Sequence, residues 1–436
     1  MALGSILSSL AETATTCALG HLALLGRKLP FLGSLNRLLA GSFRKALVGF
    51  STGIRRSTFA GLAVGAMLLG GCSVAGSSEP TTSTVASTEI TTTTTVACSN
   101  FRVLSGWPTS ALAAGLIVVP VNDANPQLVA PEVSNGAGGV ILFGNGATSA
   151  LSGQLSALKR LNPLGVAPLI MSDEEGGAVQ RLAGLLGAMP SARTMGATLT
   201  PSEIQSLAYN YGKKLLAVGV TMDLAPVLDV DGRPGPSATN PDGTRSFSAI
   251  PNVAAADGVA FAQGLQEAGV IPVLKHFPGL GGSSGNTDVA PASTLPLSEL
   301  KTTGLIPFEA AIGAKLPVVM MSNATVPGLT SGPASLSRVA FDYLRNHMGF
   351  SGLIITDSMS AGAIEQIGLT VPQATVRAIE AGADMVMFNT VDPAVTFKDS
   401  VVALDQAVAS GSLSRARLIG SVENILATRN IDLCAS

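Results

Sequence analysis

One short segment of the chain gathers side chains that could do chemistry. Residues 275–288 read KHFPGLGGSSGNTD and directly follow the apolar run Val270–Leu274. Lys275, His276 and Asp288 therefore stand together in a chain in which only 12% of residues are charged. A lysine at the end of an apolar strand must find a partner of opposite charge. An imidazole and a carboxylate nearby are groups that bind polar ligands and transfer protons.

The elements that must position these groups recur along the chain as short apolar runs. The runs are residues 115–121, 138–144, 167–172, 220–229, 271–277, 317–323, 352–358 and 383–390. Runs without a polar face are typical of buried parallel strands, and the segments between them, such as 202–218 and 253–268, have helical spacing. Eight such alternations predict an α/β fold, a single (β/α)8 TIM-type barrel. An open doubly wound sheet is the alternative, but no glycine-rich phosphate loop follows the first run.

Polar residues follow the third to the seventh of these runs. The sequences at these positions are DEEGG, DVDG, KHFPG, SNA and TDS, in that order. The carboxyl ends of barrel strands meet at one face, where barrel enzymes carry their active sites. This common placement predicts one site assembled from several strand ends.

Together these motifs resemble the signature of glycoside hydrolase family 3, in its single-domain β-N-acetylglucosaminidase branch. The similar segments are SDEEGGAVQRL (172–182), LAPVLDVD (224–231), TRSF (244–247), LKHFPGLG (274–281) and LIITDSMSAGAI (353–364). With the export signal described below, the chain is similar to actinobacterial, mycobacterial-type cell-envelope lipoproteins of that branch. The resemblance implies a retaining exo-glycosidase without a cofactor. Such an enzyme releases terminal β-linked N-acetylglucosamine from cell-wall-derived or related oligosaccharides.

The resemblance also implies roles for individual residues. Asp357 falls on the family's nucleophile. The residues that would bind the sugar hydroxyls are Asp173, Arg181, Arg245, Lys275 and His276. A retaining glycosidase needs a carboxylate below the anomeric carbon, and nearby cations keep such a carboxylate ionised. Taken alone, Asp357 could instead cap a helix, and His276 could be a core histidine.

The sequence departs from the family at its acid/base. The family pattern is KHFPGHG followed, after four residues, by Asp-Ser-His or Asp-Thr-His, whose Asp/His pair is the acid/base. Here Leu280 replaces the second histidine, and the closing triplet is Asn286-Thr287-Asp288. In one interpretation Asp288 is the acid/base and Asn286 supports it by hydrogen bonding, which gives the usual two carboxylates. In the other, the site has lost its acid and the protein is a catalytically impaired sugar-binding lipoprotein.

Further activities are also compatible with the family. A β-glucosidase remains open, because no residue pattern demonstrates a pocket for an acetamido group. A phosphorylase is disfavoured, because the Asp288 carboxylate would repel an anionic acceptor. One tryptophan and three tyrosines leave no long aromatic platform, which favours a short pocket for one terminal sugar. With three histidines and no CxxC pair, we expect no metal site.

Composition limits the possible partners. The net charge is −2 and no basic stripe is present, which excludes nucleic acid as the expected partner. After residue 72 every apolar run is shorter than the roughly 20 residues that a membrane-spanning helix needs. We therefore expect a soluble body, a monomer, whose partners are a small oligosaccharide and, through a lipid anchor only, a membrane.

The N-terminal part predicts export. Arg55-Arg56, the apolar run FAGLAVGAMLL and Leu69-Gly70-Gly71-Cys72 resemble a bacterial lipoprotein signal peptide with Cys72 as the lipidated residue. Residues 1–47 fit no export signal, so we interpret 1–72 as a doubtful extension plus the signal peptide. The resemblance implies a lipid anchor on the outer face of the cytoplasmic membrane, in the cell envelope.

A flexible tether and a closed barrel would follow this signal. Residues 73–97 are rich in Ser and Thr, which predicts a disordered tether, and 98–436 would form the barrel. Cys98 and Cys434 lie at the two ends of the barrel region, and in an oxidising compartment they could form a disulfide. Two unpaired buried thiols are the alternative.

Overall fold

The computed structural model describes residues 98–435. The predicted lipidation site Cys72, the signal peptide and the tether 73–97 lie outside the described residues. Between Cys98 and Ala435 no helix combines the length and the apolar character that crossing a membrane requires.

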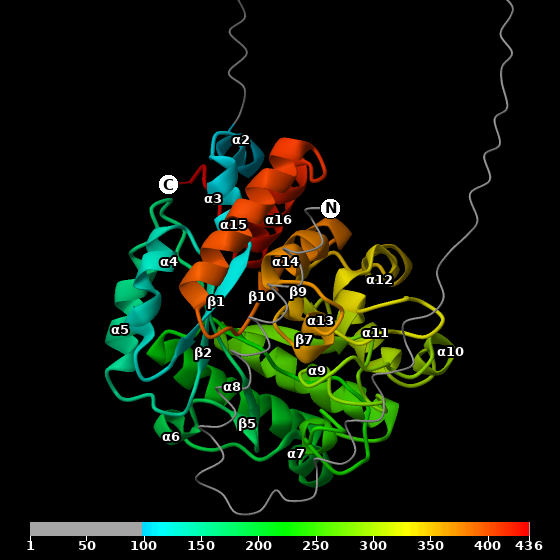
Figure 1. The fold of residues 1–436 in the computed structure, drawn as a ribbon. Helices are drawn as coiled ribbons and strands as arrows, with labels where there is room; N and C mark the ends of the chain where they lie inside the picture. Colours follow the sequence, from blue (N-terminus) through cyan, green and yellow to red (C-terminus); the bar gives the residue numbers. More distant parts are fainter. Residues whose placement is uncertain (1–97, 436) are drawn as a thin grey trace, which may run out of the picture. The chain divides into compact units, whose positions relative to one another are not determined.

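Eight parallel strands close into a barrel, which confirms the predicted fold class (Figure 1). In pairing order they are β1 (Ile117–Asn122), β10 (Met385–Met387), β9 (Leu353–Ser358), β8 (Val318–Met321), β7 (Ile271–Phe277), β6 (Met222–Asp223), β3 (Leu169–Ser172) and β2 (Gly139–Phe143). Each predicted apolar run falls on one of these strands. The run 220–229 yields only the two residues of β6, because Pro226 has no N–H to donate to a ladder. A small separate sheet, β4 (Glu174–Gly176) with β5 (Val179–Gln180), was not predicted.

Helices surround the barrel. They are α2 (Asn100–Ser105), α3 (Thr109–Ala114), α4 (Ala130–Ser134), α5 (Leu151–Lys159), α6 (Ala183–Leu186), α7 (Ala192–Thr198), α8 (Pro201–Val218), α9 (Pro251–Ala268), α10 (Leu297–Leu300), α11 (Leu305–Gly313), α12 (Arg338–Asp342), α13 (Gly362–Glu365), α14 (Val371–Ala381), α15 (Pro393–Ser410) and α16 (Arg415–Thr428). Short turns of 3-10 or π helix are η1 (Pro126–Val129), η2 (Gly243–Arg245), η3 (Ala334–Leu336) and η4 (Tyr343–His347). The predicted helices 202–218 and 253–268 correspond to α8 and α9.

The packing of α8 on α9 shows how the sequence builds the outer layer. Helix α8 begins with a capping box, in which Thr200 and Glu203 each bond the other's backbone N–H. A Cβ atom on Gly264 of α9 would come within 2.2 Å of the Gln205 carbonyl oxygen of α8. Only glycine at this position allows the two helices to approach so closely.

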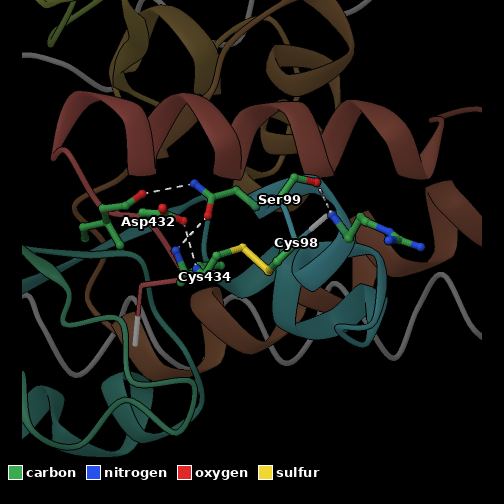
Figure 2. Close-up of a disulfide and its surroundings, with 8 residues drawn as sticks. Cys98, Ser99, Asp432 and Cys434 are labelled. Carbon is green, nitrogen blue, oxygen red and sulfur yellow. Dashed lines mark hydrogen bonds between the residues drawn. A yellow bond between two sulfur atoms is a disulfide. The ribbon is translucent and has the colours of Figure 1, made fainter. Parts of the chain in front are cut away.

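The two ends of the described chain lie side by side, with α16 next to α2 and α3 (Figure 1). Cys98 and Cys434 form a disulfide, the pairing expected from the sequence (Figure 2). Asn100 reinforces this junction, because its Nδ2 donates to the Ile431 carbonyl at 3.1 Å and its Oδ1 accepts from the Leu433 N–H at 2.8 Å. The barrel is thus closed by a covalent bond as well as by the pairing of β1 with β10.

Removal of this disulfide should destabilise the barrel. The bond joins residues 336 positions apart, so it strongly restricts the unfolded chain. We expect the double variant Cys98→Ser, Cys434→Ser to lose about 2–4 kcal/mol of unfolding free energy in urea titrations. Reduction should weaken the wild type by the same amount and leave the double variant unaffected. Equal stability of all four samples would contradict the expectation.

Candidate active site

A cavity of 590 Å³ opens at the C-terminal ends of the barrel strands. Its wall contains all eight residues predicted for the site: Asp173, Arg181, Arg245, Lys275, His276, Asn286, Asp288 and Asp357. They come from β7 and β9 and from the segments that follow β3, β6 and β7. The structure therefore brings together residues that are up to 184 positions apart in the chain (357 − 173).

Lys275 is the cation at the base of the cavity. It is 2% exposed, and its Nζ lies 2.8 Å from Asp173 Oδ1 and 2.6 Å from Glu175 Oε1. Burial lowers the pKa of Lys275, but these two carboxylates outweigh burial and raise it above its ordinary value. The lysine is therefore protonated. Two carboxylates are the oppositely charged partners that the sequence predicted for it.

Arg245 and Arg181 extend this network. The guanidinium of Arg245 binds Glu175 through two nitrogens, both at 2.8 Å. Arg181 approaches Asp173 at 3.6 Å and lies over the Phe143 ring, 5.5 Å from its centroid. Burial would raise the pKa of Glu175, but Arg245 and Lys275 lower it below its usual range. Both carboxylates of the network are therefore ionised.

Arg193 holds the loop after β6, and with it Arg245, in place. Arg193, on α7, donates from Nε to the Ser246 carbonyl at 3.1 Å and from a terminal nitrogen to the Gly243 carbonyl at 3.0 Å. The same side chain also donates to the Asp231 carbonyl. One arginine thus fixes three carbonyl groups around η2, which ends at Arg245.

His276 is oriented by a buried carboxylate. Its Nδ1 lies 2.6 Å from Asp229 Oδ2, and the other Asp229 oxygen accepts the Leu280 N–H, also at 2.6 Å. Burial and the neighbouring Arg245 lower the pKa of His276, so the ring is neutral. Because a carboxylate oxygen accepts, Nδ1 carries the proton and Nε2 is left as an acceptor.

Asp242 lies behind this pair and completes a buried cluster. The ligand atoms of Asp229, Asp242 and His276 all lie within 4.8 Å of one another, so by composition the cluster could hold a metal ion. In this geometry, however, His276 and Asp229 are already joined by a hydrogen bond. Burial and the Asp229 charge raise the pKa of Asp242 well above its usual range, so Asp242 holds a proton.

Asp357, the predicted nucleophile, is the penultimate residue of β9. Its Oδ1 accepts the Ser358 N–H at 2.7 Å. Burial raises the pKa of Asp357 and the Asp288 carboxylate adds to this, whereas the charge of Lys275 opposes the rise. Within the described residues, the ion pairs of Lys275 go to Asp173 and Glu175. Of the predicted lysine and arginine cations, Lys275 lowers the pKa of Asp357 through space without contacting it, and burial still raises this pKa overall.

Asp288 lies on an exposed loop that is docked on the helix after the nucleophile. The Asp288 and Thr287 carbonyls accept the N–H groups of Gly362 and Ala363, at 3.0 and 2.9 Å. A Cβ atom on Gly362 would come within 2.3 Å of the Val289 carbonyl oxygen, so glycine permits this contact. The loop that carries Asp288 and the strand that carries Asp357 are thus joined through α13.

Asn286 shapes the same loop from within. Its Oδ1 accepts the Asp288 N–H at 3.0 Å, and its Nδ2 donates to the Ser237 carbonyl at 3.2 Å. The predicted support of Asp288 by Asn286 therefore acts on the backbone of Asp288. No hydrogen bond joins the Asn286 side chain to the Asp288 carboxylate within residues 98–435.

Three carboxylates of the site had no predicted role: Glu175, Asp229 and Asp242. Glu175 could have been found from the sequence DEEGG, because alternate residues of an extended segment share one face. Asp173 and Glu175 then point to one side and Glu174 to the other. Asp229 and Asp242 carry no comparable signal, because their partner His276 approaches only in the folded barrel.

Glu174 lies on the opposite side of this segment and is fully buried. Its carboxyl group binds the Ser172 hydroxyl at 2.6 Å, the Tyr211 hydroxyl at 2.8 Å and the Leu182 N–H at 3.0 Å. Burial raises the pKa of Glu174 to about 7, although these hydrogen bonds partly oppose the rise. At neutral pH this group therefore titrates next to the Asp173 and Glu175 carboxylates of the network.

This raised pKa predicts a pH-dependent stability. The unfolded chain has the ordinary pKa of 4.5, so the protonated carboxyl stabilises the fold below that pH. The contribution falls as pH rises from about 4.5 to about 7, by about 3 kcal/mol at most. Glu174→Gln, which keeps the acceptor and cannot ionise, should lack this loss. Urea unfolding at pH 5 and pH 7.5 checks this expectation. The free energy of unfolding of the variant, relative to that of the wild type, should be higher at pH 7.5 than at pH 5. The same difference between the two proteins at both pH values would contradict the expectation.

Comparisons with known proteins agree with one another. The family model described as the glycosyl hydrolase family 3 N terminal domain matches residues 115–428. The β-hexosaminidase LpqI of Mycobacterium tuberculosis is 36% identical over 321 residues, which are 72% of this chain and 80% of that protein. The structure of a family 3 glycosyl hydrolase from Mycobacterium smegmatis has a TM-score of 0.68 at 36% identity, and covers 74% of this chain and 98% of that one. The β-N-acetylhexosaminidase from Beutenbergia cavernae has a TM-score of 0.68 at 29% identity, and covers 74% and 99%.

Proposed function

Because the chain belongs to glycosyl hydrolase family 3, we propose that it is a retaining, exo-acting β-N-acetylglucosaminidase. It is a glycoside hydrolase of the β-N-acetylhexosaminidase type, and relatives named β-hexosaminidase support the choice of an acetamido sugar. The substrate would be a cell-wall-derived or related oligosaccharide. The observation that carries the mechanism is that Asp357 and a second carboxylate, Asp288, line one cavity with a network of fixed cations.

The network fits the hydroxyl groups of one terminal sugar. Asp173 accepts a hydrogen bond from Lys275, forms a longer ion pair with Arg181 and still lines the cavity, so its oxygens can also accept from hydroxyls. Arg181 Nε is buried and has no hydrogen-bond partner within the described residues, which leaves this donor for a ligand. Hydrogen bonds to charged groups contribute about 1.5–3 kcal/mol each. Lys275 and Arg245 fix the carboxylates in place, and His276 offers Nε2.

The reaction would proceed in two steps. Protonated Asp288 donates its proton to the glycosidic oxygen while the Asp357 carboxylate attacks the anomeric carbon, so the leaving sugar departs as an alcohol. Asp288, now ionised, then removes a proton from water, and the resulting hydroxide attacks the anomeric carbon and frees Asp357. Two inversions give retention of the β configuration.

A panel of 4-nitrophenyl glycosides tests this function. We expect the purified protein to hydrolyse the N-acetyl-β-glucosaminide at least about tenfold faster than the β-glucoside, and the α-anomers not at all. Added phosphate should not divert the product to a sugar phosphate. Binding of N-acetylglucosamine without hydrolysis of any glycoside would contradict the proposal and favour an impaired, sugar-binding protein.

The location in the cell is a separate part of the proposal. The motif that ends at Cys72, together with a relative named as a secreted glycosyl hydrolase, supports export with a lipid on Cys72. A single acyl chain gives only marginal membrane binding, so a stable anchor needs a second acyl chain or another signal.

Replacement of the lipidated residue should therefore release the protein. We expect Cys72→Ala to abolish incorporation of a labelled fatty acid and to shift the protein from the membrane pellet to the soluble fraction. Ser78→Ala, which lies after the motif, is the matched control and should behave as the wild type. Persistent labelling of the Cys72→Ala protein would overturn the anchor.

A further inference from the structure

The strand that carries the nucleophile loses its neighbour on one side just before the nucleophile. The pairing of β8 with β9 ends where Met321 lies opposite Thr356, and Met321 is the last residue of β8. Asp357 and Ser358 therefore lie beyond the ladder on the β8 side. Backbone groups at such a strand end are free to move unless a side chain supplies the hydrogen bonds that the ladder no longer provides.

A side chain of the SNA segment, which follows β8, supplies one of these bonds. Continued by two positions, the register of β8 and β9 would place Asn323 opposite Ser358. The Nδ2 of Asn323 donates to the Ser358 carbonyl at 2.7 Å. The amide thus takes the place of a ladder hydrogen bond at the position where the ladder has stopped.

Asn323 is itself held in one orientation. It is 1% exposed, and its Oδ1 accepts the hydroxyl of Ser335, a fully buried residue of η3, at 2.5 Å. The backbone beside it is fixed as well, because the Ser322 carbonyl accepts the Ser335 N–H at 2.9 Å. The Ser358 carbonyl can only accept, so the amide nitrogen of Asn323 must face it.

Ser358 connects this amide to the nucleophile. Its N–H donates to Asp357 Oδ1 at 2.7 Å, and its carbonyl is the group that Asn323 holds. The next N–H, that of Met359, donates to the Met387 carbonyl of β10 at 2.8 Å. The peptide group after Ser358 is therefore held from the β8 side and from β10. A carboxylate whose Oδ1 is bound by so fixed a donor keeps its other oxygen in one direction, which nucleophilic attack requires.

We propose that Asn323 is a positioning residue for the nucleophile, and that it acts through Ser358 on the direction of the Asp357 carboxylate. The inference rests on the proposed function, because it takes Asp357 to be the attacking group. Asn323 does not line the cavity, so it should affect the rate of attack and not the affinity for the sugar.

Asn323→Leu in the full-length protein tests the role, because leucine has a similar size and no donor. The Ser358 carbonyl then lacks its partner, so kcat for 4-nitrophenyl N-acetyl-β-glucosaminide should fall by about 10–100-fold. The dissociation constant of N-acetylglucosamine, measured by calorimetry, should stay within about twofold of the wild-type value. An unchanged kcat per folded molecule, or equal losses of rate and of affinity, would overturn the proposal.

A second variant tests the same hydrogen bond while Asn323 stays in place. Ser335→Ala frees Oδ1 of the amide, and kcat should fall by about three- to tenfold, again with the affinity for N-acetylglucosamine kept. Ser400→Ala removes an equally buried hydroxyl on α15 and is the matched control, which should keep the wild-type kcat. The same kcat in the Ser335→Ala and Ser400→Ala proteins would also overturn the proposal.

Hydrogen exchange separates this inference from the proposed function. If the wild type hydrolyses no glycoside, the proposed function fails, and the hold of Asn323 on the end of β9 is still measurable. Deuterium uptake by the peptide that contains Ser358, followed by mass spectrometry, should be about tenfold faster in Asn323→Leu than in the wild type. Equal uptake by the two proteins would overturn the positioning role.

Discussion

Asp357→Asn should lower kcat by roughly 10³–10⁵-fold and prevent formation of a glycosyl-enzyme. An amide at the end of β9 keeps the shape of the site but cannot displace the leaving group. A slow fluorinated N-acetylglucosaminide should add the mass of one sugar to the wild type and nothing to the variant. The added mass should lie on the peptide that contains Asp357.

The same carboxylate sets the acidic limit of activity. The nucleophile must be ionised, and burial raises its pKa above the ordinary 3.8. Activity should therefore fall as pH decreases through this raised pKa. Unchanged activity of Asp357→Asn, in a sample whose thermal unfolding matches the wild type, would contradict the retaining mechanism.

Asp288→Ala should slow hydrolysis most for substrates whose leaving group must be protonated. The leaving sugar of a natural disaccharide would depart as a strongly basic alkoxide unless its oxygen is protonated. We therefore expect kcat/KM for the disaccharide to fall by about 10²–10⁴-fold. A 4-nitrophenyl glycoside has a good leaving group, and its first step should be nearly unaffected. Measurement of kcat/KM for both substrates gives the comparison.

Chemical rescue distinguishes a missing acid/base from a damaged loop. Azide can occupy the space of the lost carboxylate and attack the glycosyl-enzyme without a general base, so it should restore turnover of the aryl glycoside as a glycosyl azide. Gly362→Ala would displace the same loop through Val289 while keeping Asp288, and azide should not rescue it. If Asp288→Ala lowers kcat/KM equally for the disaccharide and the aryl glycoside, another residue is the acid/base.

The barrel was predictable because each of its strands has a recognisable sequence pattern. Runs such as 271–277 are apolar on both faces, and parallel strands buried between helices require this pattern. Lys275 was predictable as part of the site for the same reason: a cation in such a run needs a partner. The identity of the partners was not, because Asp173 and Glu175 lie about 100 positions away and meet Lys275 only when the barrel closes.

The sequence points to Asp288 as the proposed acid/base, but it does not show how the loop that carries this residue is held. The sequence shows that Asp288 stands where the family has histidine, and a carboxylate can do the same chemistry. The docking of the Asp288 loop on α13 depends on Gly362, which has no Cβ atom. The sequence does not show why glycine is needed there, because the loop and α13 meet only in the folded protein.

The stereochemistry of the first product tests the central claim most directly. Proton NMR can follow hydrolysis of 4-nitrophenyl N-acetyl-β-glucosaminide, which releases a single sugar, and detect which anomer of that sugar forms before mutarotation. The account predicts that β-N-acetylglucosamine appears first, because attack by Asp357 and then by water inverts the anomeric carbon twice. Appearance of the α-anomer first, or no release of N-acetylglucosamine, would contradict it.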